Sequence, residues 1–337
     1  EDALKYFPSL LVRKRYIGDY NHAILSSRAS GTGNSARSAV YADGILLSNY
    51  LGNGVSGLSF PPRWGLVTPE EIERVDVMYG PFSAAYPGNS VGAVVDYVTR
   101  MPRQFEAHAQ IGYVSQPFDL YSTHATFPAW QTSASLGSKS GDWSWFLNLN
   151  HTDSHGQPLT FPTRLQSAGS ASSAGSAVSG AVAERNNTEA PIYILGSGTE
   201  FHTLQDHAKL KLAYDITPAV RASYTFGAWQ NASQGRPASY LRDSNGQPVY
   251  SGTININGLA FSGAQALGGG DYAMTNESLS HTMQGLSVKS HSQGVWDWEV
   301  AASQYNYNQD EKRQNAAANP FPAAASGGPG TLANGAG

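Results

Sequence analysis

The chain has 337 residues, a formal net charge of −4 and no cysteine. A charge this near neutral argues against a nucleic-acid partner held by phosphate neutralisation, and zero cysteine is compatible with a periplasmic or outer-membrane protein. Only 14% of the residues are charged, against roughly 25% in an average soluble domain, and no run of about 18 apolar residues supplies a transmembrane helix.

The first hundred residues predict a small mixed α+β core. Thr68 can cap a helix, Pro69 suits its first position, and Glu71 stands where a capping box needs a carboxylate. We expect this helix to be short, because residues 75–79 alternate like a strand and Gly80 follows them directly.

The order of motifs in this region resembles the plug domain of TonB-dependent outer-membrane receptors. YADGILL and then TPEEIERVDVMYGPFSAAYPGNSVGAVVDYVTR are similar to that family's V-D-G turn, its I-E-R-I-E-V strand, its G-P-x-S-x-x-Y-G corner and its G-G-V-I-N-I-x-T strand. The positions taken as the plug motif are Asp43, Gly44, Glu73, Arg74, Gly80, Pro81, Tyr86, Gly88, Gly92 and Arg100. Two departures are Pro87, between the tyrosine and glycine of the corner, and Ala93, where the family has its second glycine.

The resemblance implies that residues 1–103 are a plug domain without its N-terminal part. A generic α+β domain is the alternative, since each motif alone is common. The family's energy-coupling box is not found, and the sequence starts at EDALKYFPSL and ends in PGTLANGAG. We therefore expect a piece of a longer protein, without its signal peptide.

Residues 104–337 change to a pattern with period two, typical of strands. In residues 143–150, tryptophan and leucine occupy one face and Ser144, Phe146 and two asparagines the other. Similar alternation predicts about seven strands of ten to twelve residues, near 104–115, 129–138, 142–152, 202–215, 219–230, 279–291 and 295–306. Such lengths suit tilted strands crossing a bilayer. The predicted fold is a membrane β-protein, an α+β plug followed by antiparallel transmembrane strands, seven of the twenty-two that the resemblance implies.

The connections between these strands alternate in length. Short turns are expected at Ser140-Gly141, Thr217-Pro218 and Gln293-Gly294, and long extracellular loops near 153–201, 231–278 and 307–337. Short turns on one side and long loops on the other are typical of outer-membrane barrels. The run SAGSASSAGSAVSGAVA in the first long loop predicts a flexible, solvated segment.

Tryptophans gather beside two of the short turns. Trp143 and Trp145 follow one turn, and Trp296 and Trp298 follow another. Aromatic rings with a polar edge favour the membrane interface, so these four predict an aromatic girdle at the periplasmic rim. The alternative is two aromatic pairs in the core of a β-sandwich.

Several charged residues are candidates for contacts inside a barrel. Lys209, Lys211 and Arg221 face inward if the alternation is right. The first interpretation is ordinary solvation and pairing with plug carboxylates, and the alternative is attraction of an anionic ligand, with Trp229 as a further ligand contact. The plug's Arg74 and Arg100 are expected to pair with acidic wall residues, Asp297 or Glu299.

His151 and His155 flank a carboxylate, a pattern that can hold a metal when the two imidazoles share a face. We expect the strand to run into a loop at these residues. We also expect that two histidines four residues apart share a face only in a helix. The sequence therefore favours a solvated loop over a metal site. No metal site and no cofactor are predicted.

No catalytic arrangement of nucleophile, base and acid is found, so we expect no enzyme. The resemblance implies a monomeric importer of the bacterial outer membrane, surrounded by lipid. It would bind a scarce ligand, most often a ferric siderophore, and a TonB-type inner-membrane protein would pull on its plug through the missing box. The alternatives are a secreted β-sandwich that binds glycans and a passive porin or adhesin barrel. The sequence does not identify the ligand.

Overall fold

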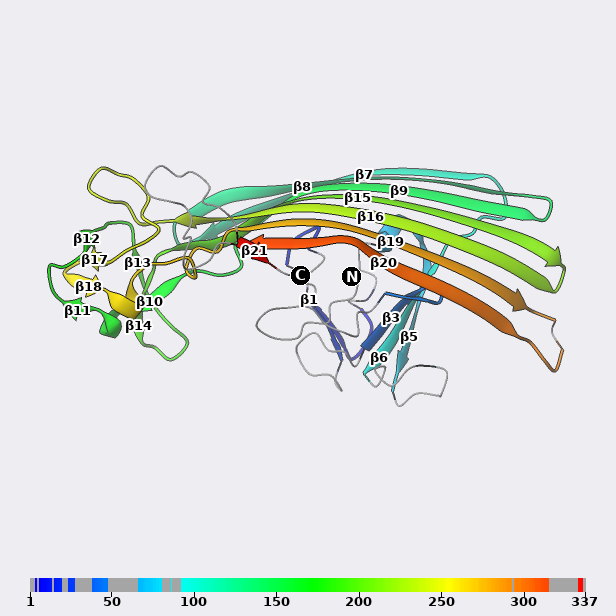
Figure 1. The fold of residues 1–337 in the computed structure, drawn as a ribbon, viewed down its shortest axis with the longest axis horizontal. Coiled ribbons are helices and arrows are strands. Elements are labelled where there is room, and N and C mark those ends of the chain that lie inside the picture. Colours follow the sequence, from blue (N-terminus) through cyan, green and yellow to red (C-terminus); the bar gives the residue numbers. More distant parts are fainter. Residues whose placement is uncertain are drawn as a thin grey trace.

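The computed structural model describes residues 4, 6–13, 15–19, 24–27, 38–47, 66–80, 86, 92–292, 294–314 and 333–335. Within these ranges, helical residues occur only as short 3₁₀ turns, and none is a helix of the length and apolarity that would carry it across a membrane. Strands dominate, arranged as a small plug beneath one long, curved sheet (Figure 1).

The plug contains a mixed four-stranded sheet. Its order is β4 (Ile45–Leu46), β3 (Ser38–Ala42), β6 (Ala93–Thr99) and β5 (Ile72–Tyr79), with β3 and β6 parallel. A separate antiparallel pair is formed by β1 (Leu10–Arg13) and β2 (Ile24–Ser27). Asp43 and Gly44 both have positive φ, 50° and 79°, which closes the tight hairpin between β3 and β4. The predicted short helix is a single 3₁₀ turn, η3 (Pro69–Glu71), after Thr68.

The second part is an antiparallel sheet of eight strands, called here the wall. In spatial order, its strands are β7 (Glu106–Leu120), β8 (Thr123–Ser140), β9 (Trp143–Gly156), β15 (Gly196–Thr217), β16 (Val220–Ser239), β19 (Thr275–Ser290), β20 (Glu299–Gln314) and the short β21 (Ala333–Gly335). Seven of these are long, which confirms the predicted number for the described residues.

The predicted strand lengths are wrong, because the long strands have 14 to 22 residues. Most continue beyond the expected ends on the side opposite the turns at residues 141–142 and 218–219, and on that side β7 and β8 are joined by a turn at residues 121–122. Beside the last turn the error is opposite. β19 ends at Ser290 and β20 begins only at Glu299, so Trp296 and Trp298 lie in the connection rather than on a strand.

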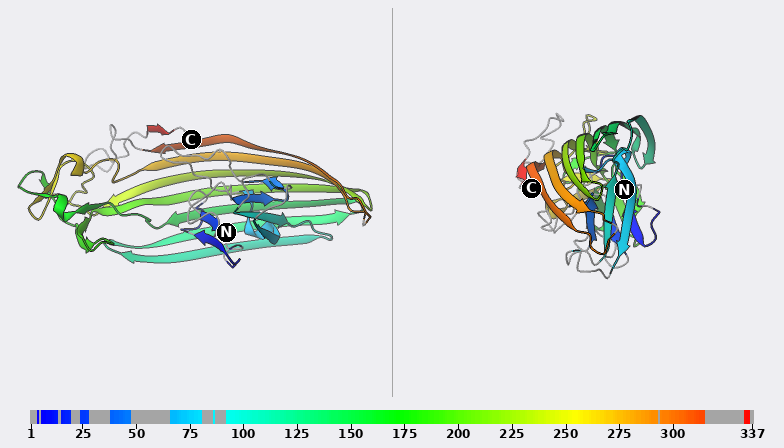
Figure 2. Two further views of the ribbon diagram at one scale, coloured as in Figure 1. Left: turned by 90° about the horizontal axis from the view of Figure 1, so that it is seen from below. Right: turned by 90° about the vertical axis from the view of Figure 1, so that its right-hand side faces the viewer.

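The predicted alternation of the wall strands is right. Trp143 and Leu149 are 57% and 47% exposed, whereas Ser144 and Asn148 between them are 1% and 0% exposed. The side bearing Ser144 is called the inner face, and the opposite side the outer face. The sheet curves around the plug, which lies against the inner face (Figure 2). A sandwich would bury the tryptophan and leucine face against a second sheet, and here Trp143 and Leu149 on that face are exposed.

Plug and wall share one apolar cluster. Its plug members are Leu4, Val40, Ala42, Ile45, Leu47, Leu66, Val95 and Tyr97, and its wall members are Trp229, Leu279 and Met283. Two wall glycines make the close approach feasible. A Cβ at Gly285 would stand 2.5 Å from Cδ1 of the plug's Ile45, and a Cβ at Gly156 would stand 2.6 Å from the Tyr16 ring. The inner face is therefore shaped to this plug.

The two long connections beyond the wall, 157–195 and 240–274, are called the apical segments. The first segment forms a small sheet of its own, with the order β10 (Thr163–Leu165), β14 (Pro191–Ile194) and β13 (Val182–Arg185). Both segments contribute to a second sheet, with the order β11 (Ser170–Ala171), β18 (Leu259–Phe261), β17 (Ile254–Ile256) and β12 (Ser176–Ala177). The 3₁₀ turns η5 (Gln166–Ala168) and η6 (Gly263–Gln265) complete them.

The first expected long loop, 153–201, contains short strands that the sequence did not predict, while its small-residue run at 167–183 is largely exposed, as expected of a solvated segment. The apical segments enclose their own core, in which Leu195, Leu241, Phe261 and Tyr272 are fully buried. Arg164 fixes the two segments together, donating to both carboxylate oxygens of Asp271 at 2.7 and 2.8 Å. Small residues of the run at 167–183 allow close packing of the two segments, because Ser170–Ala171 and Ser176–Ala177 pair with strands at residues 259–260 and 254–255.

Candidate functional site: the interface between plug and wall

A fully buried ion pair joins the plug to the wall. The Lys209 Nζ of β15 lies 2.9 Å from Oε2 of the plug's Glu71, and both side chains are 0% exposed. The other carboxylate oxygen of Glu71 accepts a hydrogen bond from the Thr68 N–H at 2.8 Å, so the capping carboxylate also serves as the wall's counter-ion. His207, also buried, lies 3.9 Å from Glu71.

A second pair lies one inner-face position further along β15. Lys211 Nζ is 3.0 Å from Oδ2 of Asp43 and also donates to the hydroxyl and carbonyl oxygens of Thr99. Asp43 in turn accepts from the backbone N–H and the hydroxyl of Thr99 at 2.8 and 2.5 Å. The hairpin turn, the end of β6 and the wall are therefore tied together by one hydrogen-bonded group.

Two further polar contacts reach the plug from β7 and β9. His108 Nδ1 is 3.0 Å from Oε1 of Glu70, and the Asn148 amide donates to the Thr68 hydroxyl at 2.6 Å. In every described ion pair between the two parts, the plug supplies the acid and the wall the base. Opening the interface requires the buried charges of Lys209 and Glu71 to separate, a step that costs several kcal/mol per uncompensated ion.

The expected pairing of Arg74 with the wall acids Asp297 or Glu299 is wrong, and that of Arg100 stays a prediction. Arg74 pairs with Asp76 of its own strand at 3.1 Å, and Glu299 pairs with Lys289 at 2.8 Å. The carboxylate of Asp297 accepts bonds from Ser290 and Ser292 beside it. The reason is position. Asp297 and Glu299 lie at the end of the wall that carries the turns near residues 141, 218 and 294, called here the turn end, where local partners are nearer than the plug.

The four candidate ligand contacts do not come together. Lys209 and Trp229 are 1% and 3% exposed and lie beneath the plug, so neither offers surface to a ligand in this arrangement. Lys211 and Arg221 line a cavity of about 1720 Å³ between the plug and the turn end of the wall. Arg221 there donates to Asp215 of its own sheet at 3.0 Å.

Two carboxyl groups of the plug border this cavity and have opposite pKa shifts. Burial alone would raise the pKa of Asp43, but the charges of Lys211 and Lys209 and the Thr99 hydrogen bonds lower that pKa below its ordinary 3.8. Burial, and then the neighbouring Asp43 charge, raise the pKa of Asp96 above its ordinary value. Asp43 therefore stabilises the interface as an anion, while ionised Asp96 opposes it.

These shifts predict how acid affects the seating of the plug. A lowered folded pKa gives a contribution that is complete above 3.8, the ordinary value, and is lost as the pH falls through the folded pKa. We expect the urea midpoint of plug release to fall steeply below about pH 4 in the parent, and less steeply in Asp43→Asn. Asp96→Asn is the control of opposite sign and should raise the midpoint at neutral pH. Equal acid sensitivity in the parent and Asp43→Asn would contradict this assignment.

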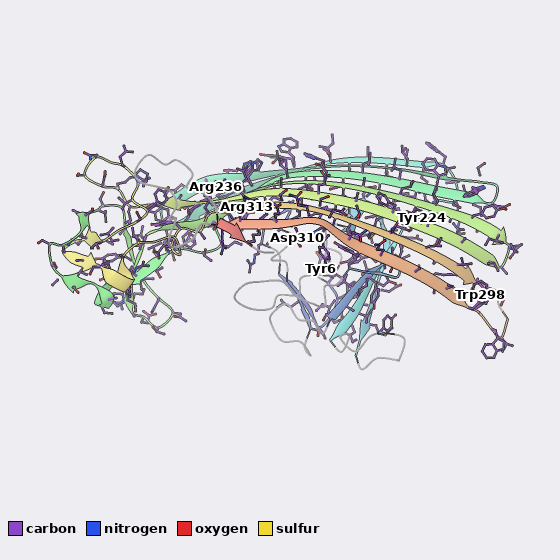
Figure 3. All side chains as sticks on the ribbon, in the orientation of Figure 1. Tyr6, Tyr224, Arg236, Trp298, Asp310 and Arg313 are labelled. Atoms are coloured by element: carbon purple, nitrogen blue, oxygen red, sulfur yellow. The ribbon has the colours of Figure 1, made fainter. Side chains whose placement is uncertain are left out.

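The predicted aromatic girdle residues lie on the outer face or at its turn end. Trp296 and Trp298 are 85% and 50% exposed, and Trp298 projects at the turn end of the sheet (Figure 3). The Trp143 ring lies 4.7 Å from that of Tyr214 on the next strand, and Trp145 is half-buried on the same face. A membrane-interface role for all four remains a prediction.

Most plug-motif positions have local roles. Asp43 and Gly44 make the hairpin turn, Gly92 is buried before β6, and the Arg100 N–H donates to the Glu71 carbonyl at 2.8 Å. Glu73 and Arg74 are exposed on β5, Gly80 follows that strand, and the Tyr86 ring meets that of Tyr41 edge-on at 6.0 Å. Pro81 and Gly88 lie outside the described residues.

Sequence reasoning missed the acidic half of the interface. The sequence indicates Glu71 only as a capping residue, and it gives no role to Glu70, Thr99, His108 or Asn148. One signal was present: two lysines two residues apart on an otherwise apolar-alternating strand need buried counter-ions if that face is covered.

Comparison with known proteins identifies the smaller part. Residues 1–94 match the family model described as TonB-dependent Receptor Plug Domain, which confirms the resemblance over this segment. No curated protein matches the chain in sequence.

Among solved structures, the chain is similar to three receptors. For the ferric preacinetobactin receptor BauA of Acinetobacter baumannii, the identity is 12%, the TM-score 0.46, and the match covers 97% of this chain and 46% of that one. For a mutant of the ferric enterobactin receptor PfeA of Pseudomonas aeruginosa in complex with enterobactin, the identity is 10% and the TM-score 0.46, and the match covers 96% of this chain and 53% of that one. For the ferric-catecholate import receptor Fiu of E. coli K12, the identity is 14% and the TM-score 0.44, and the match covers 98% of this chain and 48% of that one. The chain spans about half the length of these structures.

Proposed function

We propose, on the premise that residues 1–94 are a plug domain of TonB-dependent receptors, that the chain is the plugged portion of an outer-membrane importer. The outer face of the wall contacts lipid except at its apical end, the plug closes the passage on the inner face, and the apical segments project outside the cell. An inner-membrane protein of the TonB type supplies the work that moves the plug, and no catalytic chemistry is involved.

One observation carries the proposal: the plug is seated against the inner face by buried charges and a shared apolar cluster. A seat of this kind blocks diffusion, and thermal motion alone opens it rarely because separated ions would be left uncompensated. A ligand can favour opening only by the difference in its affinity for the closed and open states. An external source of energy is therefore expected.

The outer face supports the membrane placement. Exposed apolar side chains lie on the outer face of neighbouring strands, among them Ile111, Tyr113, Leu136, Trp143, Leu149, Phe226 and Leu286. So many exposed apolar residues on one face exceed what a soluble monomer usually presents. Hydrocarbon is the solvent that suits such a surface.

The ligand class we propose is a ferric siderophore, the cargo that the plug resemblance most often implies. The test is uptake in a strain that carries the complete receptor, compared with its deletion, for a panel of radiolabelled ferric chelates, cobalamin and oligosaccharides. We expect uptake of one chelate that stops when a protonophore collapses the proton gradient. Uptake that survives the protonophore would favour the passive porin, and recovery of the complete protein in plain buffer without detergent would favour the sandwich.

A further inference from the structure

Five ligand-forming side chains share the outer face at the apical end of β9 and β15. β9 continues to Gly156, so His151, Asp153 and His155 lie on one face of one strand, and the expectation that they enter a loop is wrong. The expectation that only a helix would bring the two histidines to one face is also wrong, because alternate residues of a strand project to the same side. His202 and Asp206 of β15 complete the group.

The tightest part of this group is formed by Asp153, His155 and His202. His202 is paired directly opposite His155 across the two strands, and Asp153 is two residues away on the same face. His202 Nε2 lies 2.9 Å from Asp153 Oδ1, and one ligand atom from each of the three lies within 4.8 Å of the others. Donors at positions i, i+2 and directly across a strand pair converge on one point above the sheet.

The chemistry of the donors selects a class of ion. Two imidazoles and one carboxylate suit Zn²⁺ and its neighbours among the divalent transition metals, and they disfavour Mg²⁺ and Ca²⁺, which prefer oxygen ligands. Asp153 and His202 are each 41% exposed, so an ion has access and water can complete its coordination. The side chains paired across from Asp153 and His202 on the outer strands β8 and β16 are Trp130 and Gln234, neither of them a cation.

We propose that Asp153, His155 and His202 form a binding site for a divalent transition-metal ion on the outer face of the wall. The two imidazole rings now stack in parallel, 4.1 Å apart at 4°, so one ring turns on binding to aim its nitrogen at the ion. The bound ion links β9 to β15 where the wall meets the apical segments. The site faces away from the plug, so it is independent of ligand import, and the ion is not cargo.

A neighbouring pair supports this site without belonging to it. His151 Nδ1 is 2.8 Å from Asp206 Oδ1. These two residues are paired directly across the strands on the outer face, two residues from Asp153 toward the turn end. This pair holds the two strands in register directly beside the site, and it places a second carboxylate nearby to favour a cation. His151→Ala should therefore weaken binding less than His202→Ala.

The test is calorimetric titration of the complete, untagged receptor in detergent with Zn²⁺, with each variant made in that receptor. We expect one ion per chain, and affinity weaker by more than about tenfold in His155→Ala, His202→Ala and Asp153→Asn. The matched control is His124→Ala, which removes a similar exposed pair, His124 with Asp119 at 2.7 Å, that lacks a third ligand. Melting of each variant without metal shows that it is folded.

A second readout uses the neighbouring indole. Trp130 is half-exposed and paired directly opposite Asp153, so bound Cu²⁺ should quench its fluorescence, and Trp130→Phe should remove most of that quenching. No binding by the parent chain would overturn the proposal. So would equal Zn²⁺ affinity, or an equal rise in melting temperature with Zn²⁺, in His202→Ala and His124→Ala.

Discussion

Replacing Lys209 with methionine is expected to destabilise the seated plug by about 3–5 kcal/mol, as removal of one partner of a buried ion pair does elsewhere. Methionine keeps most of the volume of the lysine stem, so the loss comes from Glu71, left charged with no exposed surface. The measurement is the urea midpoint of plug release, followed by protease cleavage within residues 66–80 of the receptor in detergent micelles.

A second substitution should recover much of this loss. Glu71→Gln in the Lys209→Met background removes the uncompensated charge of the carboxylate. The amide oxygen of the glutamine can still accept the hydrogen bond that the Thr68 N–H donates to Glu71 at 2.8 Å. Replacing both members of a buried pair with neutral groups is often close to neutral in stability. The double variant should therefore lie nearer to the parent than to Lys209→Met.

The control is the same substitution in an exposed pair. Lys289 lies 2.8 Å from Glu299, but their side chains are 54% and 48% exposed. Such pairs contribute less than about 1 kcal/mol, so Lys289→Met should leave the midpoint almost unchanged. If Lys209→Met were as mild as Lys289→Met, or if Glu71→Gln gave no recovery, the buried pair would not hold the plug.

The alternation of the wall could be predicted from sequence because its cause is local. A covered inner face and an open outer face impose a period of two on every strand, and residues 143–150 show it without knowledge of any partner. The plug hairpin was equally readable, since Asp43-Gly44 supplies the positive φ that the turn requires. The strand ends could not be predicted, because the strands continue past their apolar stretch and no residue pattern marks where they stop.

The interface itself was beyond local reasoning. Lys209 and Glu71 are separated by well over a hundred residues, and nothing in either neighbourhood says which acid meets which base. The sequence indicated that Lys209 and Lys211 face inward, and it left two interpretations of them open. The contacts of Lys209 with Glu71 and of Lys211 with Asp43 agree with pairing to plug carboxylates. A ligand role for the two lysines stays a prediction. The apical segments failed for the same reason, because their core forms only between two connections far apart in the chain.

A disulfide between plug and wall tests most directly whether the plug must move. Cγ1 of Ile45 lies 2.9 Å from where a Cβ at Gly285 would stand, which puts the two Cβ atoms about 4 Å apart, within the range of disulfides. Since the chain has no cysteine, Ile45→Cys with Gly285→Cys introduces its only two thiols. The matched control is Ser223→Cys with Ser287→Cys, a cross-strand pair within the wall whose hydroxyl oxygens are 2.7 Å apart.

The measurement is ligand uptake by cells that carry the complete receptor with each cysteine pair, before and after reduction. The account predicts that the oxidised plug-to-wall pair binds ligand but does not import it, that reduction restores import, and that the pair within the wall imports normally in both states. Import at the parent rate through a receptor whose plug is cross-linked to its wall would contradict the account.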